Sequence, residues 1–205
     1  MAGKKLKSLK INREVVPKYF AVKEAVLPFS KFPEVDVLLG PEMKSTGEVM
    51  GIGNSFGEAY FKAQRAAGVI LPKTGNVFIS VRDKDKEPVC DVAEELIKIG
   101  FNLFATRGTQ VHLEKKGIKC ERINKVKQGH PHIVDMIKNG NVHLIINTTE
   151  GALSIKDSFS IRKEANNHNV CLTTTISGAK AFCKAILFID NFDALDIQSR
   201  HSSIN

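Results

Sequence analysis

The sequence predicts an α/β domain over residues 71–205, built as three layers around a doubly wound, five-stranded parallel sheet, with a smaller α+β segment over residues 1–70 before it. Two observations support this. In the second region, short apolar runs alternate with segments whose apolar residues have helical spacing, and glycine or proline separates them at short intervals. Strands that alternate with helices need crossover connections, so they form a parallel sheet covered on both faces.

The first region offers little for an independent core. Residues 22–29 (VKEAVLPF) form a short extended run that Pro28 ends, and a proline- and glycine-rich stretch follows. One helix is clearly predicted after Ser55, which forms a capping box with Glu58, and Gly68 closes that helix. Its apolar face contains Phe56, Ala59, Tyr60 and Ala63. We therefore expect this region to be part of a larger unit.

The second region is regular. Its strand candidates are residues 77–81, 101–105, 118–122, 142–147 and 170–172. The helix candidates begin at Pro88, near residues 109, 131 and 158, and after Ser177. The first of these helices has an apolar face made by Val89, Val92, Ala93, Leu96 and Ile97. The last has one made by Ala179, Phe182, Cys183, Ile186 and Leu187. The crossovers should be right-handed, and the polar tail from Asp190 is expected to be loosely held.

Composition narrows the functional classes. The formal charge of +8 and the pI near 9.3 favour anionic partners, whether nucleic acid, nucleotides or phosphate metabolites. No apolar run reaches the ~18 residues that cross a bilayer, and the amino terminus lacks the apolar core of a secretory signal. The sequence therefore predicts a soluble, cytoplasmic protein without a membrane partner.

No metal site is expected. The cysteines contain no C-x-x-C pair and lie in apolar segments, which favours buried reduced thiols. They are Cys90, Cys120, Cys171 and Cys183. His130 and His132 flank a proline, and we expect no acidic or thiol companion beside them.

Three loops share one chemical character at the end of a predicted strand. They are Thr106–Thr109, Asn124–Lys127 and Asn147–Gly151. Hydroxyls and N–H groups at a helix start form an anion cradle, and a lysine adds a compact positive charge. Each loop alone is also compatible with an ordinary turn, with Thr109 as a helix cap. Because ligands of such sheets bind beyond the carboxyl ends of the strands, the three loops together predict an anion site.

Catalysis is not predicted. Ser177 and His168 lack a nucleophile turn or an orienting carboxylate, and the dinucleotide pattern G-x-G-x-x-G is missing. The three loops carry no pair of acidic residues. They indicate binding of an anion without turnover.

The chain resembles the carbamoyl-phosphate synthetase large subunits. Residues 22–53 resemble the end of the second ATP-grasp unit of that family. FNLFATRGTQ, INKVKQGHPHIVDMIKNG and LIINTTEG resemble loops of the methylglyoxal-synthase-like domain that follows it. The resemblance implies an ATP-grasp remnant over 1–70 and an allosteric domain over 71–205. Because Met1 to Gly3 resemble an internal stretch of the family, the chain is expected to be an engineered or excised fragment.

The resemblance also implies regulation. In this family, the large subunit pairs with a glutaminase small subunit, self-associates, and uses ATP with Mg or Mn to form carbamoyl phosphate for pyrimidine and arginine synthesis. The terminal domain binds UMP as inhibitor and IMP as activator in overlapping sites. The fragment alone should be inactive and hold no cofactor. The residues matching the effector site are Lys86, Thr106, Thr109, Lys125, Asn147, Thr148 and Thr149.

Ornithine activates some family members from the joint between the two domains. Glu24 and Thr174 match positions used there. The family pattern has tyrosine and aspartate before that threonine, whereas this chain has Leu172 and Thr173. Losing a carboxylate opposite a cationic amine costs roughly 1.5–3 kcal/mol, so the sequence predicts weakened ornithine binding.

Two alternatives remain open. Methylglyoxal synthase shares this fold, but its phosphate elimination needs a carboxylate base in a Gly-Gly-Asp-type loop, and the matching residues 128–132 contain no acid. Nucleic-acid binding would use the basic charge, but the basic residues are dispersed and not interleaved with aromatic ones.

Overall fold

The computed structural model describes residues 3–9, 14, 16–27, 29, 36–38, 47–194 and 196–202. Pro28, the residue predicted to end the first extended run, lies outside these ranges. Among the described residues, no helix combines the length and the apolar character needed to cross a bilayer.

The predicted five-stranded parallel sheet is confirmed. Its strands are β3 (Gly75–Ser80), β4 (Phe101–Ala105), β5 (Glu121–Arg122), β6 (Leu144–Asn147) and β7 (Cys171–Thr173). All neighbours pair in parallel in the order β5-β4-β3-β6-β7. The chain moves outward from β3 to one edge and then returns to the other side of β3, which makes the sheet doubly wound.

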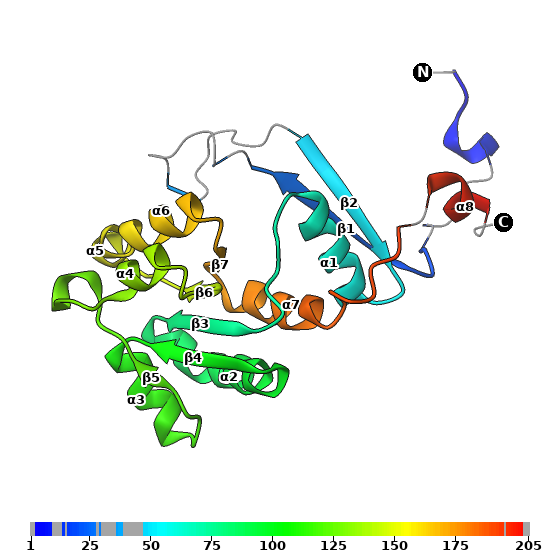
Figure 1. Ribbon diagram of the computed structural model, residues 1–205. Helices are drawn as coiled ribbons and strands as arrows, with labels where there is room; N and C mark the ends of the chain where they lie inside the picture. Colours follow the sequence, from blue (N-terminus) through cyan, green and yellow to red (C-terminus); the bar gives the residue numbers. More distant parts are fainter. Residues whose placement is uncertain are drawn as a thin grey trace.

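Helices cover both faces of this sheet (Figure 1). They are α2 (Lys86–Ile99), α3 (Arg107–Lys115), α4 (Ile133–Lys138), α5 (Ala152–Asp157), α6 (Phe159–Asn167) and α7 (Ile176–Ile186). Successive residues of β3 serve opposite faces, as expected for a strand. Val77 and Ile79 join the core cluster with α2, α3 and α7, whereas Phe78 joins the cluster with α4 and α6.

The prediction was wrong in several details. β5 has two residues where five were expected. The helix predicted near residue 158 is α6, but α5, which precedes it, was not predicted. Ile97 and Leu187, both assigned to apolar faces, are 42% and 65% exposed. α7 begins at Ile176, because the hydroxyl of Thr175 accepts a hydrogen bond from the Gly178 N–H at 3.0 Å.

The first region forms a small α+β unit. Antiparallel strands β1 (Phe20–Val26) and β2 (Gly47–Gly53) pack against α1 (Phe56–Ala66). β2 was not predicted. The predicted capping box is present in modified form, because Ser55 Oγ accepts from the Glu58 N–H while the Glu58 carboxylate accepts from the Asn54 N–H. Short helices occur at Leu6–Leu9, Asp83–Asp85, Val126–Gln128 and Ile197–Ser202 (α8).

The two regions pack against each other. α1 lies on α7, and Phe61 of α1 belongs to the main core cluster of the sheet domain. Phe192, beyond α7, meets the Phe61 ring edge-on at 6.1 Å. The boundary between residues 70 and 71 stays a prediction, although the two units share part of one core.

Candidate functional site

The strand order reverses between β3 and β6, at the point where ligands bind in doubly wound sheets. Ser80 ends β3 and pairs in register with Asn147, which ends β6. The loop after β4 begins beside them, because the Thr106 N–H donates to the carbonyl of Ile79 at 3.3 Å. Two of the three predicted loops therefore meet at this edge.

Ser80 connects these loops. Its hydroxyl accepts a hydrogen bond from Thr106 Oγ1 at 3.3 Å. Its carbonyl accepts from Asn147 Nδ2 at 3.4 Å and from the Thr148 N–H at 3.1 Å. Sequence reasoning missed Ser80, because only the residues after the later strands were inspected. Ser80 lies inside the first predicted strand, residues 77–81, one residue before its predicted end.

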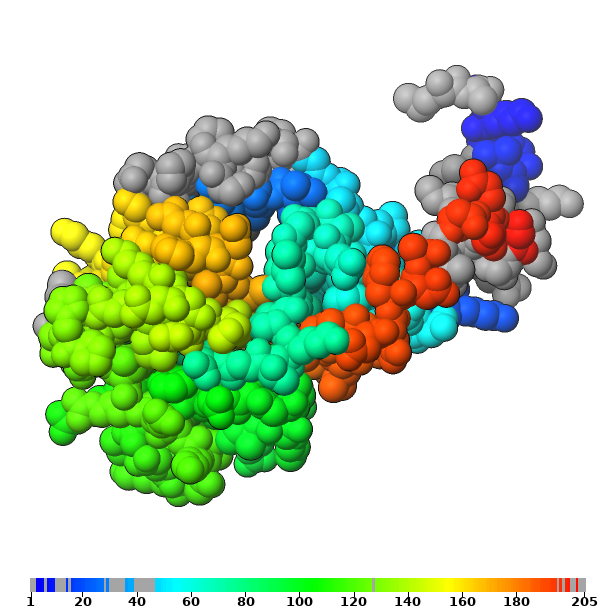
Figure 2. Space-filling model, viewed as in Figure 1, coloured from blue at the N-terminus to red at the C-terminus, as the bar shows by residue number. Residues whose placement is uncertain are grey.

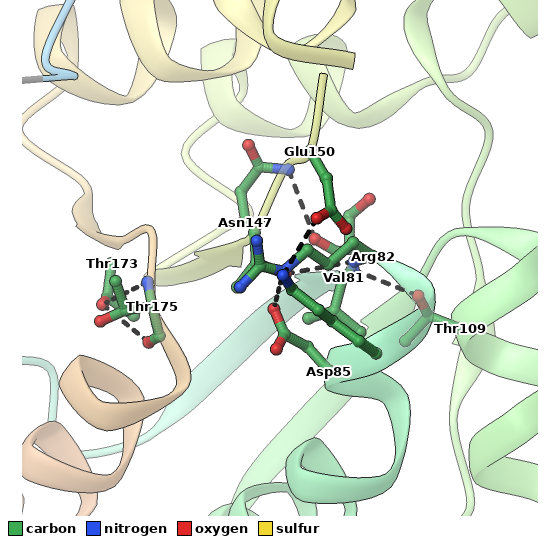
Figure 3. A network of polar contacts seen from close by, with 11 residues as sticks. Val81, Arg82, Asp85, Thr109, Asn147, Glu150, Thr173 and Thr175 are labelled. Carbon is green, nitrogen blue, oxygen red and sulfur yellow. Dashed lines mark hydrogen bonds and ion pairs between the residues drawn. The ribbon is translucent and has the colours of Figure 1, made fainter.

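Two threonine hydroxyls fix the backbone that follows β3, and Figure 3 shows the contact of one of them, Thr109, with Val81. Thr109 Oγ1 accepts from the Val81 N–H at 3.3 Å, and Thr148 Oγ1 accepts from the Arg82 N–H at 3.1 Å. Both threonines are buried, at 1% and 5% exposure. A hydroxyl that accepts one hydrogen bond keeps its own hydrogen for donation. Thr148 gives that hydrogen to Asp85, whereas the Thr109 hydroxyl can still donate to an anion.

An ion pair borders this network. Arg82 Nε donates to Asp85 Oδ2 at 2.6 Å. Burial raises the pKa of Asp85, but hydrogen bonds from Arg82 and Thr148 and the nearby positive charges outweigh burial and lower it overall. The carboxylate is thus ionised and partly neutralises Arg82.

Lys86 lies over the first turn of α3. A Cβ atom added to Gly108 would be 3.5 Å from Lys86 Nζ. The same ammonium contacts the exposed carboxylate of Asp83 at 2.7 Å. The Thr106 side chain makes no capping hydrogen bond to α3, and the first-turn N–H groups of a helix have no intrahelical acceptor. Lys86 and α3 together thus present positive charge at this edge.

Lys125 reaches the site through a cavity of about 210 Å³. This cavity, called the rim pocket below, is lined by Ser80, Lys125, Val126, Gln128, Asp157 and Ile161. Ser80 is therefore common to the threonine network and to the lysine. The Lys125 N–H donates to Gln128 Oε1 at 3.0 Å, which fixes the loop that carries the lysine.

Asn147 is as deeply buried as Thr109. It is 1% exposed, and its Oδ1 atom is buried without a hydrogen-bond partner among the described residues. Its Nδ2 also approaches Ser158 Oγ at 3.5 Å. Thr149 follows at the same edge and is half-buried. A buried amide with an unused acceptor is typical of a site that awaits a ligand or water.

A second cavity of about 810 Å³ lies between the two regions. Glu24 and Thr174 both line it, together with Leu172 and Thr173. Figure 2 shows the surface hollowed between α1 and α6. Burial raises the pKa of Glu24, although a hydrogen bond from the Gln64 side chain opposes the shift. Among the described lining residues, Glu24 is the acidic one.

One expectation about histidine was wrong. The first turn of α4 brings a carboxylate to His130 and His132, so these residues do have an acidic companion. Asp135 Oδ2 lies 2.7 Å from His130 Nδ1 and 3.2 Å from His132 Nδ1. The i, i+3 spacing of His132 and Asp135 could have indicated this contact.

Comparison with known proteins agrees with the expected family. Residues 88–174 match the model of the MGS-like domain. The whole chain is 54% identical to the carbamoyl phosphate synthase large chain of Pseudomonas putida, 51% to that of Xanthomonas campestris and 50% to that of Ralstonia nicotianae. The chain spans 19% of the length of each of these relatives.

A solved structure is also similar. Methylglyoxal synthase from Elizabethkingia anophelis superposes with a TM-score of 0.47 and 19% identity. The match covers 64% of this chain and 92% of that one.

Proposed function

Because the chain belongs to the family of carbamoyl phosphate synthase large chains, of whose length it spans 19%, we propose that it is a regulatory segment that binds nucleoside monophosphates. The effectors would be UMP as inhibitor and IMP as activator, in overlapping sites at the rim of the sheet. The catalytic reaction, with ATP and Mg or Mn, belongs to other parts of such a protein. The glutaminase small subunit would be its partner.

The convergence of loops at the end of β3 is the observation that carries the proposal. Thr106, Thr109 and Thr148 bring hydroxyls from two loops to within hydrogen-bonding distance of residues 80–82. Hydroxyls, an amide and an ammonium together complement a phosphate dianion, since charge-assisted hydrogen bonds are the strong ones. Lys125 would supply charge from the pocket side and Lys86 from the α3 side.

The rim pocket is small for a whole nucleotide. Its 210 Å³ falls below the roughly 300–1,000 Å³ of complete ligand pockets, so the phosphate and part of the ribose would occupy it. Asp157 and Gln128 line the same pocket and offer acceptors for ribose hydroxyls. The base would then lie against the outer surface.

Ornithine is the weaker part of the proposal. Glu24 can hold a cationic amine in the 810 Å³ cavity, and Thr174 also lines this cavity. Leu172 and Thr173 line that cavity where the family pattern has tyrosine and aspartate. We expect ornithine to bind much more weakly than the nucleotides.

Calorimetric titration tests the nucleotide site. UMP, IMP, uridine and inorganic phosphate would be titrated into the chain in parallel. Lys125→Ala should weaken UMP binding roughly 10- to 150-fold, because a hydrogen bond to a charged group contributes about 1.5–3 kcal/mol. Lys98→Ala is the matched control, because Lys98 is exposed near the end of α2 that leads into the start of β4.

Three outcomes would oppose the proposal. Equal affinity of wild type and Lys125→Ala for UMP would remove the lysine from the site. Uridine binding as tightly as UMP would show that the phosphate is not recognised. Formation of methylglyoxal from dihydroxyacetone phosphate at enzymatic rates would favour a phosphate lyase instead.

A further inference from the structure

We propose that His130, His132 and Asp135 form a binding site for a divalent transition-metal ion such as zinc, a function independent of the proposed nucleotide site. One donor atom of each residue lies within 4.8 Å of the other two. The two histidine rings are neighbours, with centroids 4.4 Å apart. Both Nδ1 atoms approach the same oxygen, Oδ2 of Asp135.

The donor set suits such an ion. Two imidazoles and one carboxylate are ligands that zinc takes in proteins, with a fourth position left for water. Bonds of about 2.0–2.2 Å in tetrahedral geometry place ligand atoms roughly 3.4 Å apart. The two nitrogen–oxygen separations, 2.7 and 3.2 Å, are slightly shorter. A small outward movement of the exposed His130 ring would make room for the ion.

Two of the three ligands are held in place. The His132 N–H donates to Asp135 Oδ2 at 2.9 Å, which orients the carboxylate. The Asp135 N–H donates to His132 Nδ1 at 3.4 Å, a long hydrogen bond that an ion bound to this nitrogen would replace. The Ile133 N–H donates to the carbonyl of Asn124 at 3.3 Å, which fixes this segment next to the sheet. Preorganised ligands lose little freedom when they bind an ion.

The third ligand provides access. The side chain of His130 is 77% exposed, whereas that of His132 is 9% exposed. An ion can thus approach from solvent and be enclosed by the His130 ring.

The cluster is distinct from the nucleotide site. None of its three residues is among the described lining of the rim pocket. The cluster and the rim pocket are close in the sequence, because Gln128 lines the pocket and His130 follows two residues later. An ion here would bind whether or not a nucleotide does.

Zinc titration of the chelator-treated, tag-free 205-residue chain tests the site. Calorimetry should show one equivalent of Zn²⁺, and Co²⁺ should give the visible absorption of a tetrahedral complex. His130→Ala should weaken zinc binding about tenfold or more, since even partners of ligands matter by 10- to 100-fold. His168→Ala is the control, because His168 lies near a single carboxylate, Glu164, at 3.6 Å.

The zinc titration has one outcome that supports the site and others that contradict it. Stoichiometric binding that His130→Ala and Asp135→Asn both weaken, while His168→Ala leaves it unchanged, supports the site. Absence of one-to-one zinc binding in the wild type, or equal affinity in His130→Ala, would show that the cluster only caps α4. His130 is exposed, so an unchanged melting curve of the metal-free variant would confirm that it still folds.

Discussion

The ion pair between Arg162 and Asp36 ties the sheet domain to the first region, and breaking it should be costly. Arg162 is fully buried on α6. Its Nε and Nη2 donate to the two carboxylate oxygens of Asp36 at 2.7 and 2.6 Å, and Nη2 also donates to the carbonyl of Ile155 at 2.9 Å. Nη1 is buried without a hydrogen-bond partner among the described residues.

Asp36→Ala would leave this guanidinium charged, buried and largely unpaired. Breaking a buried pair costs about 3–5 kcal/mol, and the quarter exposure of the Asp36 side chain favours the lower end. For a chain of this size, about 3 kcal/mol corresponds to a melting temperature lower by roughly 6–12 °C. Urea unfolding followed by circular dichroism measures the loss directly.

Two further variants make the test sharp. Asp91→Ala removes an exposed pair with Lys180, whose side chains are 75% and 47% exposed, and should cost about 1 kcal/mol or less. Asp36→Ala combined with Arg162→Met removes the buried charge as well and should be more stable than Asp36→Ala alone. Equal losses in Asp36→Ala and Asp91→Ala would refute the reasoning.

Three other predictions follow from burial and close packing. Burial raises the pKa of Asp36, but the hydrogen bonds and charge of Arg162 act against burial, and the pKa is lowered overall. The stabilisation from this ion pair is therefore present above pH ~4 and is lost as the pH falls through the lowered pKa. In urea unfolding, the difference in stability between wild type and Asp36→Ala should shrink over that pH range. Gly51→Ala should destabilise by about 1–3 kcal/mol in the same assay, because the new Cβ would lie 2.0 Å from the carbonyl oxygen of Ala59, whereas Gly47→Ala, with nothing within 4 Å, should not. Burial raises the pKa of every cysteine, so iodoacetamide should label them slowly in the native chain and fully in urea, as mass spectrometry would show. The pKa is raised for Cys90 and reaches about 12 for Cys120, Cys171 and Cys183.

The sheet domain was predictable because its apolar runs are separated by clear stop signals. Gly100 and Gly117 both adopt positive φ at helix ends, where glycine is the usual stop residue. β2 was missed because its glycines resemble the stop signals that separate the other elements. Its glycines were interpreted as breakers, but Gly51 and Gly53 are there because α1 approaches too closely for a side chain.

The candidate site was only partly predictable. Hydroxyls at strand ends identified Thr106 and Thr148, because the topology of a parallel sheet places such ends at one edge. The role of Ser80 depends on which strand is central, and that order is not visible in the sequence. The sequence spacing indicates only the contact of Asp135 with His132, and the folded turn adds the contact with His130.

The position of Phe61 has a practical consequence for anyone who wishes to study the sheet domain by itself. This ring is 4% exposed and sits in the main core, and its neighbour Tyr60 lies 6.0 Å from Phe182 of α7. Removing residues 1–70 would expose the α7 surface that α1 now covers, and this apolar surface would be prone to self-association. A shortened version should either retain α1 or carry polar replacements on α7.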